Sequence, residues 1–401
     1  MWKFIVHALR LGKTVGTTGS QLLNRFGRDH NQNGRTFRIR TITTDRAQHF
    51  HIGDNNLMIE QGVRIDGLSL TVRGVGNTLT LAARARVHGL DLVIDGDQNR
   101  IHVGAGATIN GMSVVMGGNL FSGNFRGNRN HIEFGPQSGL SSTRFEVTGS
   151  DNAVSLGDRV HVVKRGEVYV TGHGCVIRIG ADTSIQSASL ATGEIETAIT
   201  VGTDNMWSDD IVVLASDGHP IARCGTLDRS NLARDVAIGD HVWLGRQAAL
   251  LKGTRIGDGC IVGARAVVCG AVADDEGALF RNATIVGAPA RPVKLDQEWF
   301  RDMIVTEQGY ELKYPDACAE SYFRRALWWL AKGREQLAVG HPSEATEALS
   351  ESAAACRRAV TLKPDYVFAY TVWAKVLEAI GLPEESREKV AIAAALSKGS
   401  T

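Results

Sequence analysis

The sequence predicts a mainly β fold, a parallel β-helix solenoid, followed by an α-helical domain. Three observations support this prediction: a six-residue repeat across residues 236–268, a 22-residue repeat that begins near residue 55, and helical spacing of apolar residues after residue 317. Such periods are typical of solenoids, in which each coil buries its apolar face only against neighbouring coils.

The six-residue repeat has two regular positions. An aliphatic residue opens each unit, and a small or β-branched residue follows four places later. The aliphatic residues are Ile238, Leu244, Leu250, Ile256, Val262 and Val268, and the small ones are Val242, Ala248, Thr254, Cys260 and Ala266. We expect both sets to point into the solenoid, where space is limited.

The 22-residue repeat aligns short alternating strands with glycine and asparagine corners. Asn55, Asn77 and Asn99 share one position, and Gly67, Gly89 and Gly111 share another. Nine additional residues, called here the nine-residue slip, then interrupt the repeat. The asparagine position recurs at 130 and 152, and the next repeat, which is one residue longer, has Cys175 there. We expect the corners to need positive φ and the stacked asparagines to form a hydrogen-bonded ladder.

Three segments, in this order, resemble the hexapeptide-repeat acyltransferases. Ser-Asp-Gly-His-Pro-Ile at 216–221 resembles the segment that carries the family's catalytic histidine. Val-Trp-Leu-Gly at 242–245 resembles its VWIG run, and Val-Gly-Ala-Pro-Ala-Arg at 286–291 resembles the segment after its last coil. The close resemblance covers about a quarter of the chain. It implies a left-handed β-helix, an acyl-CoA donor, most simply acetyl-CoA, and a homotrimer with active clefts between subunits.

The two repeat lengths leave the winding of the early coils open. The family's coils hold three hexapeptides, hence 18 residues, whereas a pitch of 22 also suits right-handed β-helices. Continuity into residues 236–268 favours left-handed coils with one enlarged corner.

Acyl transfer from a thioester to a hydroxyl or an amine needs a base for the acceptor's proton, and a neutral histidine suits that task at physiological pH. The resemblance places the base at His219; the alternative is a loop histidine that hydrogen-bonds the backbone. An acid that orients the imidazole is expected at Asp217, or at Asp209 or Asp210. Asp217 comes first because it faces the same side as His219 if the local chain is extended.

The resemblance also implies the remaining site residues. His241 and Trp243 are candidates for the acceptor pocket, against a surface histidine and trimer packing as the alternatives. Arg291 and Lys294 match a basic pair that meets coenzyme phosphates, for which a solvated face is the alternative. The candidate donor-binding residues are Gly245, Lys252, Gly263, Ala264, Arg291 and Lys294.

Four regions are expected. Residues 1–48 are a basic extension that either caps the solenoid or contacts an anionic membrane surface. Residues 49–190 hold the 22-residue coils, and residues 191–295 hold the catalytic β-helix with a loop at 220–234. Residues 296–401 are a connector and about four helices that resemble tetratricopeptide repeats. These helices either cover the solenoid, aid trimer contacts or dock a protein partner.

Composition excludes several other classes. With 44 Lys/Arg against 43 Asp/Glu, the chain is not a polyelectrolyte binder, and no motif for reading nucleic acid accompanies the basic extension. The six cysteines show no CxxC spacing, which together with the lack of a membrane span or leader favours a cytoplasmic protein with reduced thiols. The β-helix carbonic anhydrases hold zinc with three histidines, two of them five positions apart. No histidine of this chain has another histidine five positions later, which disfavours a zinc enzyme of this type. No metal is therefore expected.

The sequence thus predicts an O-acetyltransferase that modifies a sugar of a surface polysaccharide or its precursor. The sugar rests on family analogy alone. The alternatives are an N-acetyltransferase of an amino sugar and a non-catalytic solenoid scaffold in a polysaccharide assembly.

Overall fold

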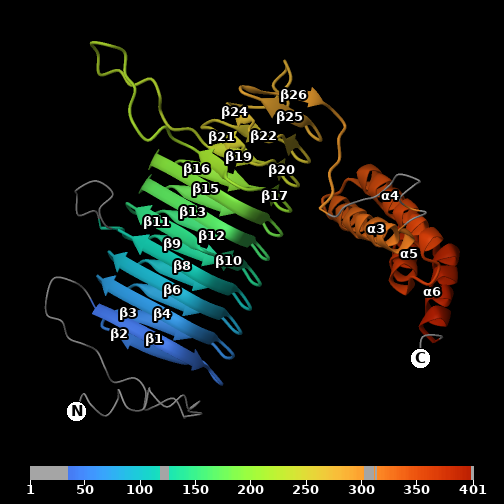
Figure 1. Cartoon of the computed structure of the whole chain (residues 1–401), viewed down its shortest axis with the longest axis horizontal. Helices are drawn as coiled ribbons and strands as arrows, with labels where there is room; N and C mark the ends of the chain where they lie inside the picture. The colour runs from blue at the N-terminus through green and yellow to red at the C-terminus, as the bar shows by residue number, and fades with distance from the viewer. Residues whose placement is uncertain (1–34, 118–125, 302–310, 312–313, 399–401) are drawn as a thin grey trace. The chain divides into compact units, whose positions relative to one another are not determined.

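The computed structural model describes residues 35–117, 126–301, 311 and 314–398. The chain divides into two compact units, one ending at Glu298 and the other beginning at Trp299 (Figure 1). The first holds two large sheets, and the described part of the second is helical. Residues 1–34 of the basic extension, for which a cap or a membrane contact is expected, lie outside the described residues.

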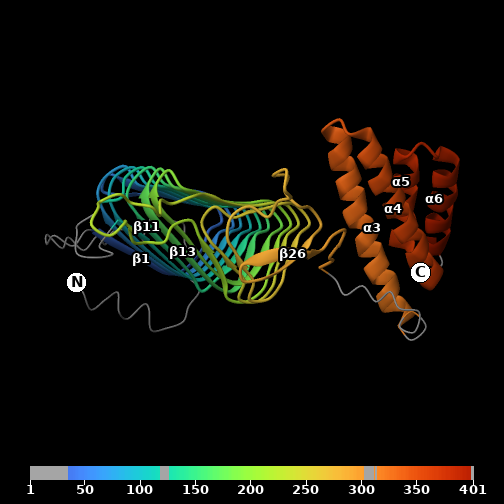
Figure 2. The ribbon, with the colours of Figure 1, turned by 90° about the horizontal axis from the view of Figure 1, so that it is seen from above.

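The first unit is a β-solenoid in which successive turns stack along one axis (Figures 1 and 2). One sheet contains β1 (Arg35–Thr43), β4 (Arg64–Arg73), β6 (Arg86–Asp95), β8 (Thr108–Met116), β10 (Gly139–Ser141), β11 (Thr143–Thr148), β13 (His161–His173), β15 (Ser184–Ile195), β17 (Met206–Trp207), β18 (Ile211–Leu214), β20 (Trp243–Leu244), β21 (Ala249–Leu250), β23 (Ile261–Val262), β24 (Val267–Val268), β25 (Thr284–Gly287) and β26 (Ala290–Lys294). The other contains β2 (Gln48–Ile52), β3 (Asn55–Ile59), β5 (Thr78–Leu81), β7 (Arg100–Val103), β9 (His131–Phe134), β12 (Ala153–Leu156), β14 (Val176–Ile179), β16 (Ala198–Val201), β19 (Val236–Ile238) and β22 (Arg255–Ile256).

Strand register confirms both repeat lengths. Leu57 pairs with Leu79 and Leu79 with Ile101, so the early turns advance by 22 residues. Ile101 then pairs with Ile132, which is the 22-residue turn plus the nine-residue slip. In the late coils Ile238 pairs with Ile256, an advance of 18 residues. The two parts form one continuous solenoid, because β15 (Ser184–Ile195) runs across the boundary expected at residue 190.

The extra residues of the early turns lie at one corner, as expected. Nine positions separate the inward residues Leu92 and Ile101. The equivalent inward residues of a late coil, Leu250 and Thr254, are only four positions apart. The same corner carries the nine-residue slip and, further along the axis, the long loop that follows β18. The enlarged corner, the slip and this loop therefore share one edge of the solenoid, whereas the last coil has its extra residues, around the Ala273–Leu279 bridge, at another corner.

The inward positions of the late coils are filled as the six-residue pattern predicts. All eleven aliphatic and small positions named above are at most 4% exposed. Trp207, Phe134 and Phe145 are among the largest fully buried side chains, and all three lie in the wider turns that precede the late coils. Small residues such as Ala248 and Ala266 thus fill the interior of the shorter, 18-residue coils.

The expected asparagine ladder is present. Asn77 Nδ2 donates to Asn55 Oδ1 at 2.8 Å and to the Gly96 carbonyl at 2.9 Å, and Asn99 repeats this arrangement one turn later. Asn130 and Asn152 continue it. The positive φ expected at these asparagines is wrong: it falls on the preceding residue, such as Gln98 before Asn99. The glycine corners do have positive φ, with 85°, 67° and 66° at Gly67, Gly89 and Gly111.

Antiparallel segments close both ends of the solenoid. At the start β1 runs antiparallel to β4, and β2 antiparallel to β3. At the other end β25 and β26 form a hairpin that follows the last coil. Reversed strands at the ends block further stacking on an open sheet edge.

The second unit contains α3 (Pro315–Ala338), α4 (Pro342–Leu362), α5 (Val367–Ala379) and α6 (Pro383–Lys398), as drawn in Figure 2. This agrees with the expected four helices; their relation to tetratricopeptide repeats stays a prediction. Two apolar residues of this helical spacing lie largely outside the core, since Leu327 and Leu337 are 42% and 50% exposed. A Cβ at Gly333 would lie 2.7 Å from Leu349 Cγ, so α3 and α4 approach too closely for large residues. None of the described helices is long and apolar enough to cross a membrane.

Candidate active site

The candidate site lies at the base of the loop between β18 and β19. Ile199 pairs with Val236 across this turn, an advance of 37 residues where the early turns advance by 22. The loop projects from the solenoid edge at the upper left of Figure 1. An isolated antiparallel bridge between Ala222 and Arg229 joins its two branches.

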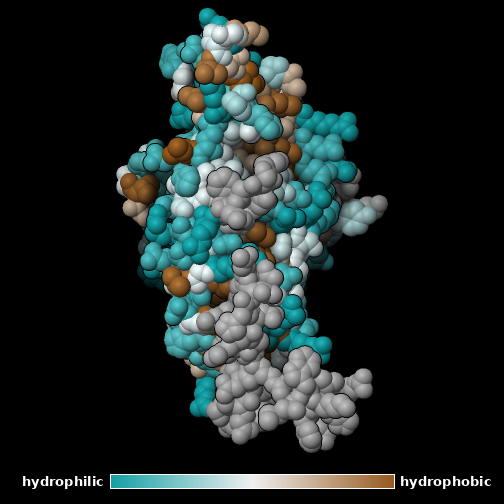
Figure 3. Space-filling model, turned by 90° about the vertical axis from the view of Figure 1, so that its left-hand side faces the viewer, coloured by the Kyte–Doolittle hydropathy of each residue, from teal (hydrophilic) through white to brown (hydrophobic). Residues whose placement is uncertain are grey.

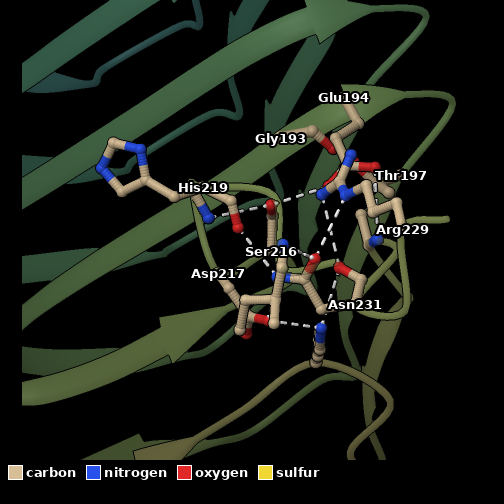
Figure 4. A network of polar contacts seen from close by, with 12 residues as sticks. Gly193, Glu194, Thr197, Ser216, Asp217, His219, Arg229 and Asn231 are labelled. Atoms are coloured by element: carbon tan, nitrogen blue, oxygen red, sulfur yellow. Dashed lines mark hydrogen bonds and ion pairs between the residues drawn. The ribbon is translucent and has the colours of Figure 1, made fainter. Parts of the chain in front are cut away.

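The chain turns sharply as it leaves the solenoid. Ser216 Oγ accepts a hydrogen bond from the Gly218 amide at 3.1 Å, and Gly218 has a φ of 75°. This conformation favours glycine and breaks the extended geometry assumed for residues 217–219. Asp217 and His219 therefore do not share a side, and in Figure 4 the imidazole points away from the polar network.

Asp217 contacts two groups other than His219. Its Oδ2 accepts hydrogen bonds from Lys252 Nζ at 2.5 Å and from Asn231 Nδ2 at 2.8 Å. The Lys252 ammonium, and next the Asn231 amide, hold the pKa of the Asp217 carboxyl below its usual range. Asp217 and Lys252, expected in separate roles, thus form one ion pair across the loop base.

A second carboxylate anchors the loop from the preceding turn. Glu194 Oε1 accepts hydrogen bonds from Arg229 and from Ser216 Oγ, and its Oε2 accepts one from the Ala233 amide (Figure 4). Burial raises the pKa of the Glu194 carboxyl, but the bonds from Arg229, Ala233 and Ser216 outweigh it and the net pKa is lowered. Glu194 is thus held as a carboxylate that joins both loop branches to β15.

His219 presents an exposed ring beside this network. Among the described residues no hydrogen-bond partner of the imidazole is found, whereas its main-chain carbonyl accepts a bond from Asn231 Nδ2 at 2.8 Å. The direct acid–imidazole contact expected from the sequence is therefore absent within one chain. The carboxylates of the two other acids considered for that role are also engaged elsewhere: Asp209 accepts from Lys164 Nζ at 2.8 Å, and Asp210 Oδ1 accepts from Ser187 Oγ at 3.4 Å.

His241 and Trp243 lie one coil further along. The expected outward position of His241 is only partly met: its side chain is 13% exposed and its Nδ1 lies 2.6 Å from Asp204 Oδ2. Trp243, on β20, is 37% exposed and pairs with Met206 and Ile261 of the neighbouring turns. Its exposed indole offers a flat apolar surface of the kind that binds sugar or acyl groups.

The candidate donor-binding residues fall into two sets. A Cβ at Gly245 would lie 2.7 Å from the Ala264 amide nitrogen, and one at Gly263 would lie 2.8 Å from Val286 Cγ1, so these glycines allow neighbouring coils to stack closely. Ala264, Arg291 and Lys294 are exposed, the last two on the closing strand β26. Their charges suit phosphate groups, whereas Lys252 already serves Asp217 and the Asn231 carbonyl.

The comparisons with known proteins decide the family. A model of the family described as "Bacterial transferase hexapeptide (six repeats)" matches residues 235–270. The chain is 30% identical over 148 residues to a polysialic acid O-acetyltransferase of Neisseria meningitidis, a match that covers 32% of this chain and 68% of that protein. The chain belongs to the hexapeptide-repeat acyltransferases. It is an O-acyltransferase whose late coils carry the family's hexapeptide repeat.

Two further matches of this hexapeptide-repeat acyltransferase are shorter or more distant. It is 35% identical over 89 residues to a polysialic acid O-acetyltransferase of Escherichia coli, which covers 22% of this chain and 28% of that protein. The crystal structure of the polysialic acid O-acetyltransferase OatWY is similar at 22% identity with a TM-score of 0.40, covering 60% of this chain and 96% of that one.

Three residues of the network in this hexapeptide-repeat acyltransferase were missed by sequence reasoning: Glu194, Arg229 and Asn231. Arg229 and Asn231 lie in a loop without periodicity, so no pattern marks them. Glu194 does carry a signal. It occupies the corner position that glycine fills in the five preceding turns, at 74, 96, 127, 149 and 172. A charged residue that breaks such a column one turn before a long loop indicates an anchor for that loop.

Proposed function

We propose that this enzyme transfers an acetyl group from acetyl-CoA to a hydroxyl of a sugar in a surface polysaccharide or its precursor, with His219 as the general base. The supporting observation is an exposed imidazole whose main chain is braced by a closed polar network at the solenoid edge. Two curated relatives are named polysialic acid O-acetyltransferases, which supports a sugar polymer as the acceptor class.

The reaction requires one proton acceptor and one proton return. An imidazole nitrogen of His219 takes the proton from the sugar hydroxyl while that oxygen attacks the thioester carbonyl. The tetrahedral intermediate then collapses, the carbon–sulfur bond breaks, and the imidazolium returns the proton to the coenzyme A thiolate. An exposed ring on a fixed main chain suits this role, because it can contact both substrates without a rearrangement of the loop.

The donor is proposed to lie along the late coils. Arg291 and Lys294 are exposed cations that can meet coenzyme phosphates, and Gly245 and Gly263 lie in the closely stacked coils beside them. Trp243 and His241 are proposed to contact the acceptor or the acyl group. Asp217 acts through the loop base rather than by touching the imidazole, and Lys252 is its partner there.

A homotrimer is the proposed assembly. Among the described solenoid residues, large exposed apolar side chains concentrate on the loop and the late coils, and brown side chains gather at that end of Figure 3. Leu227, near the loop tip, is 99% exposed. Ile221, Leu232 and Val286 are also exposed. Apolar surface gathered around a catalytic loop is typical of a subunit interface.

The proposal is tested by acetyl transfer with purified full-length enzyme. Wild type, His219→Ala and the control His88→Ala, an exposed histidine of β6, are incubated with acetyl-CoA and de-acetylated surface polysaccharide from the host. Mass spectrometry counts the acetyl groups, and mild alkali separates esters, which it cleaves, from amides. We expect ester formation by wild type and His88→Ala and a rate about 10²–10⁴-fold lower for His219→Ala.

Other outcomes overturn parts of the proposal. Alkali-stable acetyl groups would identify an N-acetyltransferase. Full activity of His219→Ala would remove His219 as the base. Absence of transfer to any host glycan, with coenzyme A unbound, would favour a scaffold.

A further inference from the structure

The orientation of the His219 side chain is not set by an acid. Within the described residues, Asp217, Asp209 and Asp210 do not contact the imidazole. The hydrogen bond to His219 is instead made to its main-chain carbonyl. The backbone on either side fixes the Cα–Cβ bond, and with it the few staggered positions that the ring can take. The groups that hold this backbone therefore determine where the ring can reach.

One side chain grips the backbone on both sides of Pro220. Asn231 Nδ2 donates to the His219 carbonyl at 2.8 Å, and Asn231 Oδ1 accepts from the Ile221 amide at 2.6 Å. Pro220 has a fixed φ and no amide proton, and it restricts the residue before it to extended conformations. With the flanking carbonyl and amide both held, little rotational freedom remains in the main chain that carries His219.

The Asn231 amide is itself fully satisfied. Its two Nδ2 protons go to Asp217 and to the His219 carbonyl, and its Oδ1 accepts from both the Ile221 amide and Arg229 Nε. This uses both donors and both lone pairs of an asparagine amide. The residue is 8% exposed, so each of these bonds is largely shielded from water.

The main chain of Asn231 is tied to the solenoid from two directions. Its carbonyl accepts from Nζ of Lys252, a residue of a late coil, at 3.0 Å and from Arg229 Nη2 at 3.3 Å. Arg229 in turn donates to Glu194 of the preceding turn. The grip on His219 is thus connected to rigid coils on both sides of the loop (Figure 4).

We propose that Asn231 is the positioning residue for His219: its amide clamps the backbone across Pro220 and so aims the imidazole at the acceptor hydroxyl. The inference rests on the proposed function, in which His219 is the base. It assigns to an amide acting on the main chain the orienting task that an acid performs in a triad.

The chemistry of the clamp demands an amide. Aspartate at position 231 has the same shape, but it cannot donate to the His219 carbonyl and would place a second carboxylate beside Asp217. Leucine keeps the volume and removes all four bonds. Ser230→Ala is the matched control, because Ser230 lies in the same loop and its Oγ donates only to the Ile221 carbonyl, at 3.1 Å.

The experiment measures steady-state kinetics of full-length Asn231→Asp, Asn231→Leu and Ser230→Ala, each also combined with His219→Ala. We expect kcat to fall about 10- to 100-fold for both Asn231 variants, with KM for acetyl-CoA within about twofold, because a misplaced base slows chemistry without removing donor contacts. Ser230→Ala keeps the wild-type kcat. In the His219→Ala background the Asn231 substitutions have no further effect.

Other results would contradict either the role of Asn231 or its premise, that His219 is the base, and the kinetics distinguish the two cases. Wild-type kcat in both Asn231 variants, or an equal loss with and without His219, would show that Asn231 does not act through the imidazole. Full activity of His219→Ala alone would remove the premise, whatever Asn231 does. If both Asn231 variants unfold the loop, as tryptic cleavage after Arg223 would reveal, Arg229→Lys replaces them. It keeps a cation for Glu194 but removes the Nε bond to Asn231; unchanged kcat there would also contradict the clamp.

Discussion

Lys252 Nζ donates to Asp217 Oδ2 at 2.5 Å and so joins two residues that lie 35 positions apart. Lys252 belongs to an 18-residue coil, whereas Asp217 lies in the branch of the loop that leaves the solenoid. The same Nζ donates to the carbonyl of Asn231, in the branch that returns. A single side chain from the rigid coil therefore closes the base of the loop, on the side opposite the Glu194 anchor.

Lys252→Met is expected to loosen the loop without unfolding the solenoid. The substitution keeps the apolar stem and removes the ammonium from both loop branches. We expect tryptic cleavage after the exposed Arg223 to become about three- to tenfold faster, because local opening of the loop becomes more frequent. Cleavage is followed by mass spectrometry of the intact protein.

The control for this experiment is Lys164→Met. Lys164 Nζ donates to Asp209 at 2.8 Å on the solenoid surface, a comparable ion pair outside the loop. It should leave the cleavage rate after Arg223 unchanged. Equal rates for both variants and wild type would show that the Lys252 contact does not restrain the loop.

The solenoid could be predicted almost to the residue because its constraint is periodic. Ala248 and Ala266 had to be small and Ile238 and Ile256 aliphatic, since every turn meets the same limits of space. The enlarged corner followed from the two pitches. The prediction failed where the chain is not periodic. The Asp-Gly pair at 217–218 is a turn signal that the assumption of an extended chain passed over, and the positive φ of Gly218 turns Asp217 and His219 to different sides.

The candidate site was predictable as a set of residues but not as a set of contacts. His219, Asp217 and Lys252 were each named from motifs, while their partners Asn231, Arg229 and Glu194 come from a loop without pattern and from a different turn. Contacts between elements far apart in sequence depend on the register of the turns. The sequence signal for these contacts is the corner position that glycine holds in five successive turns and that Glu194 holds in the next.

The Glu194 anchor is expected to fail in acid. Its pKa is lowered on balance, so its folded pKa lies below the unfolded value of about 4.3. The stabilisation it gives is therefore fully present above that unfolded value and is lost as pH falls through the folded pKa. We expect the Ala233 amide, which donates to Glu194 Oε2, to keep constant protection from hydrogen exchange between about pH 7 and pH 5, and to lose it below about pH 4.

Two variants separate this carboxylate from the general effects of acid. Glu194→Gln has no titrating group there, so protection of Ala233 should be lower throughout and vary less with pH. Glu196→Gln, at an exposed corner position two residues on, should behave as wild type. A loss of protection in Glu194→Gln at the same pH and of the same size as in wild type would assign the acid transition to another group.

The asparagine ladder is expected to carry much of the stability of the early turns. Asn99 is fully buried, its Nδ2 donates to Asn77 Oδ1 and to the Gly127 carbonyl, and its Oδ1 accepts from the amide and the side chain of Asn130. Asn99→Ala leaves several of these buried groups without partners, at a cost of about 3 kcal/mol in the free energy of unfolding. For a unit that ends at Glu298, with an unfolding entropy of about 2.1 cal/mol/K per residue, that corresponds to a fall of about 5 °C in Tm.

Asn110→Ala is the matched control for the ladder. Asn110 lies on β8 in the next stretch of the same turn and is exposed, so its removal should change Tm by less than about 1 °C. Thermal unfolding followed by circular dichroism at a β-sheet wavelength compares the two variants with wild type. Equal midpoints for Asn99→Ala and Asn110→Ala would show that buried amides stacked along the axis stabilise the turns no more than asparagines in water do. The stability of the early turns would then have to be assigned to their buried aliphatic residues alone.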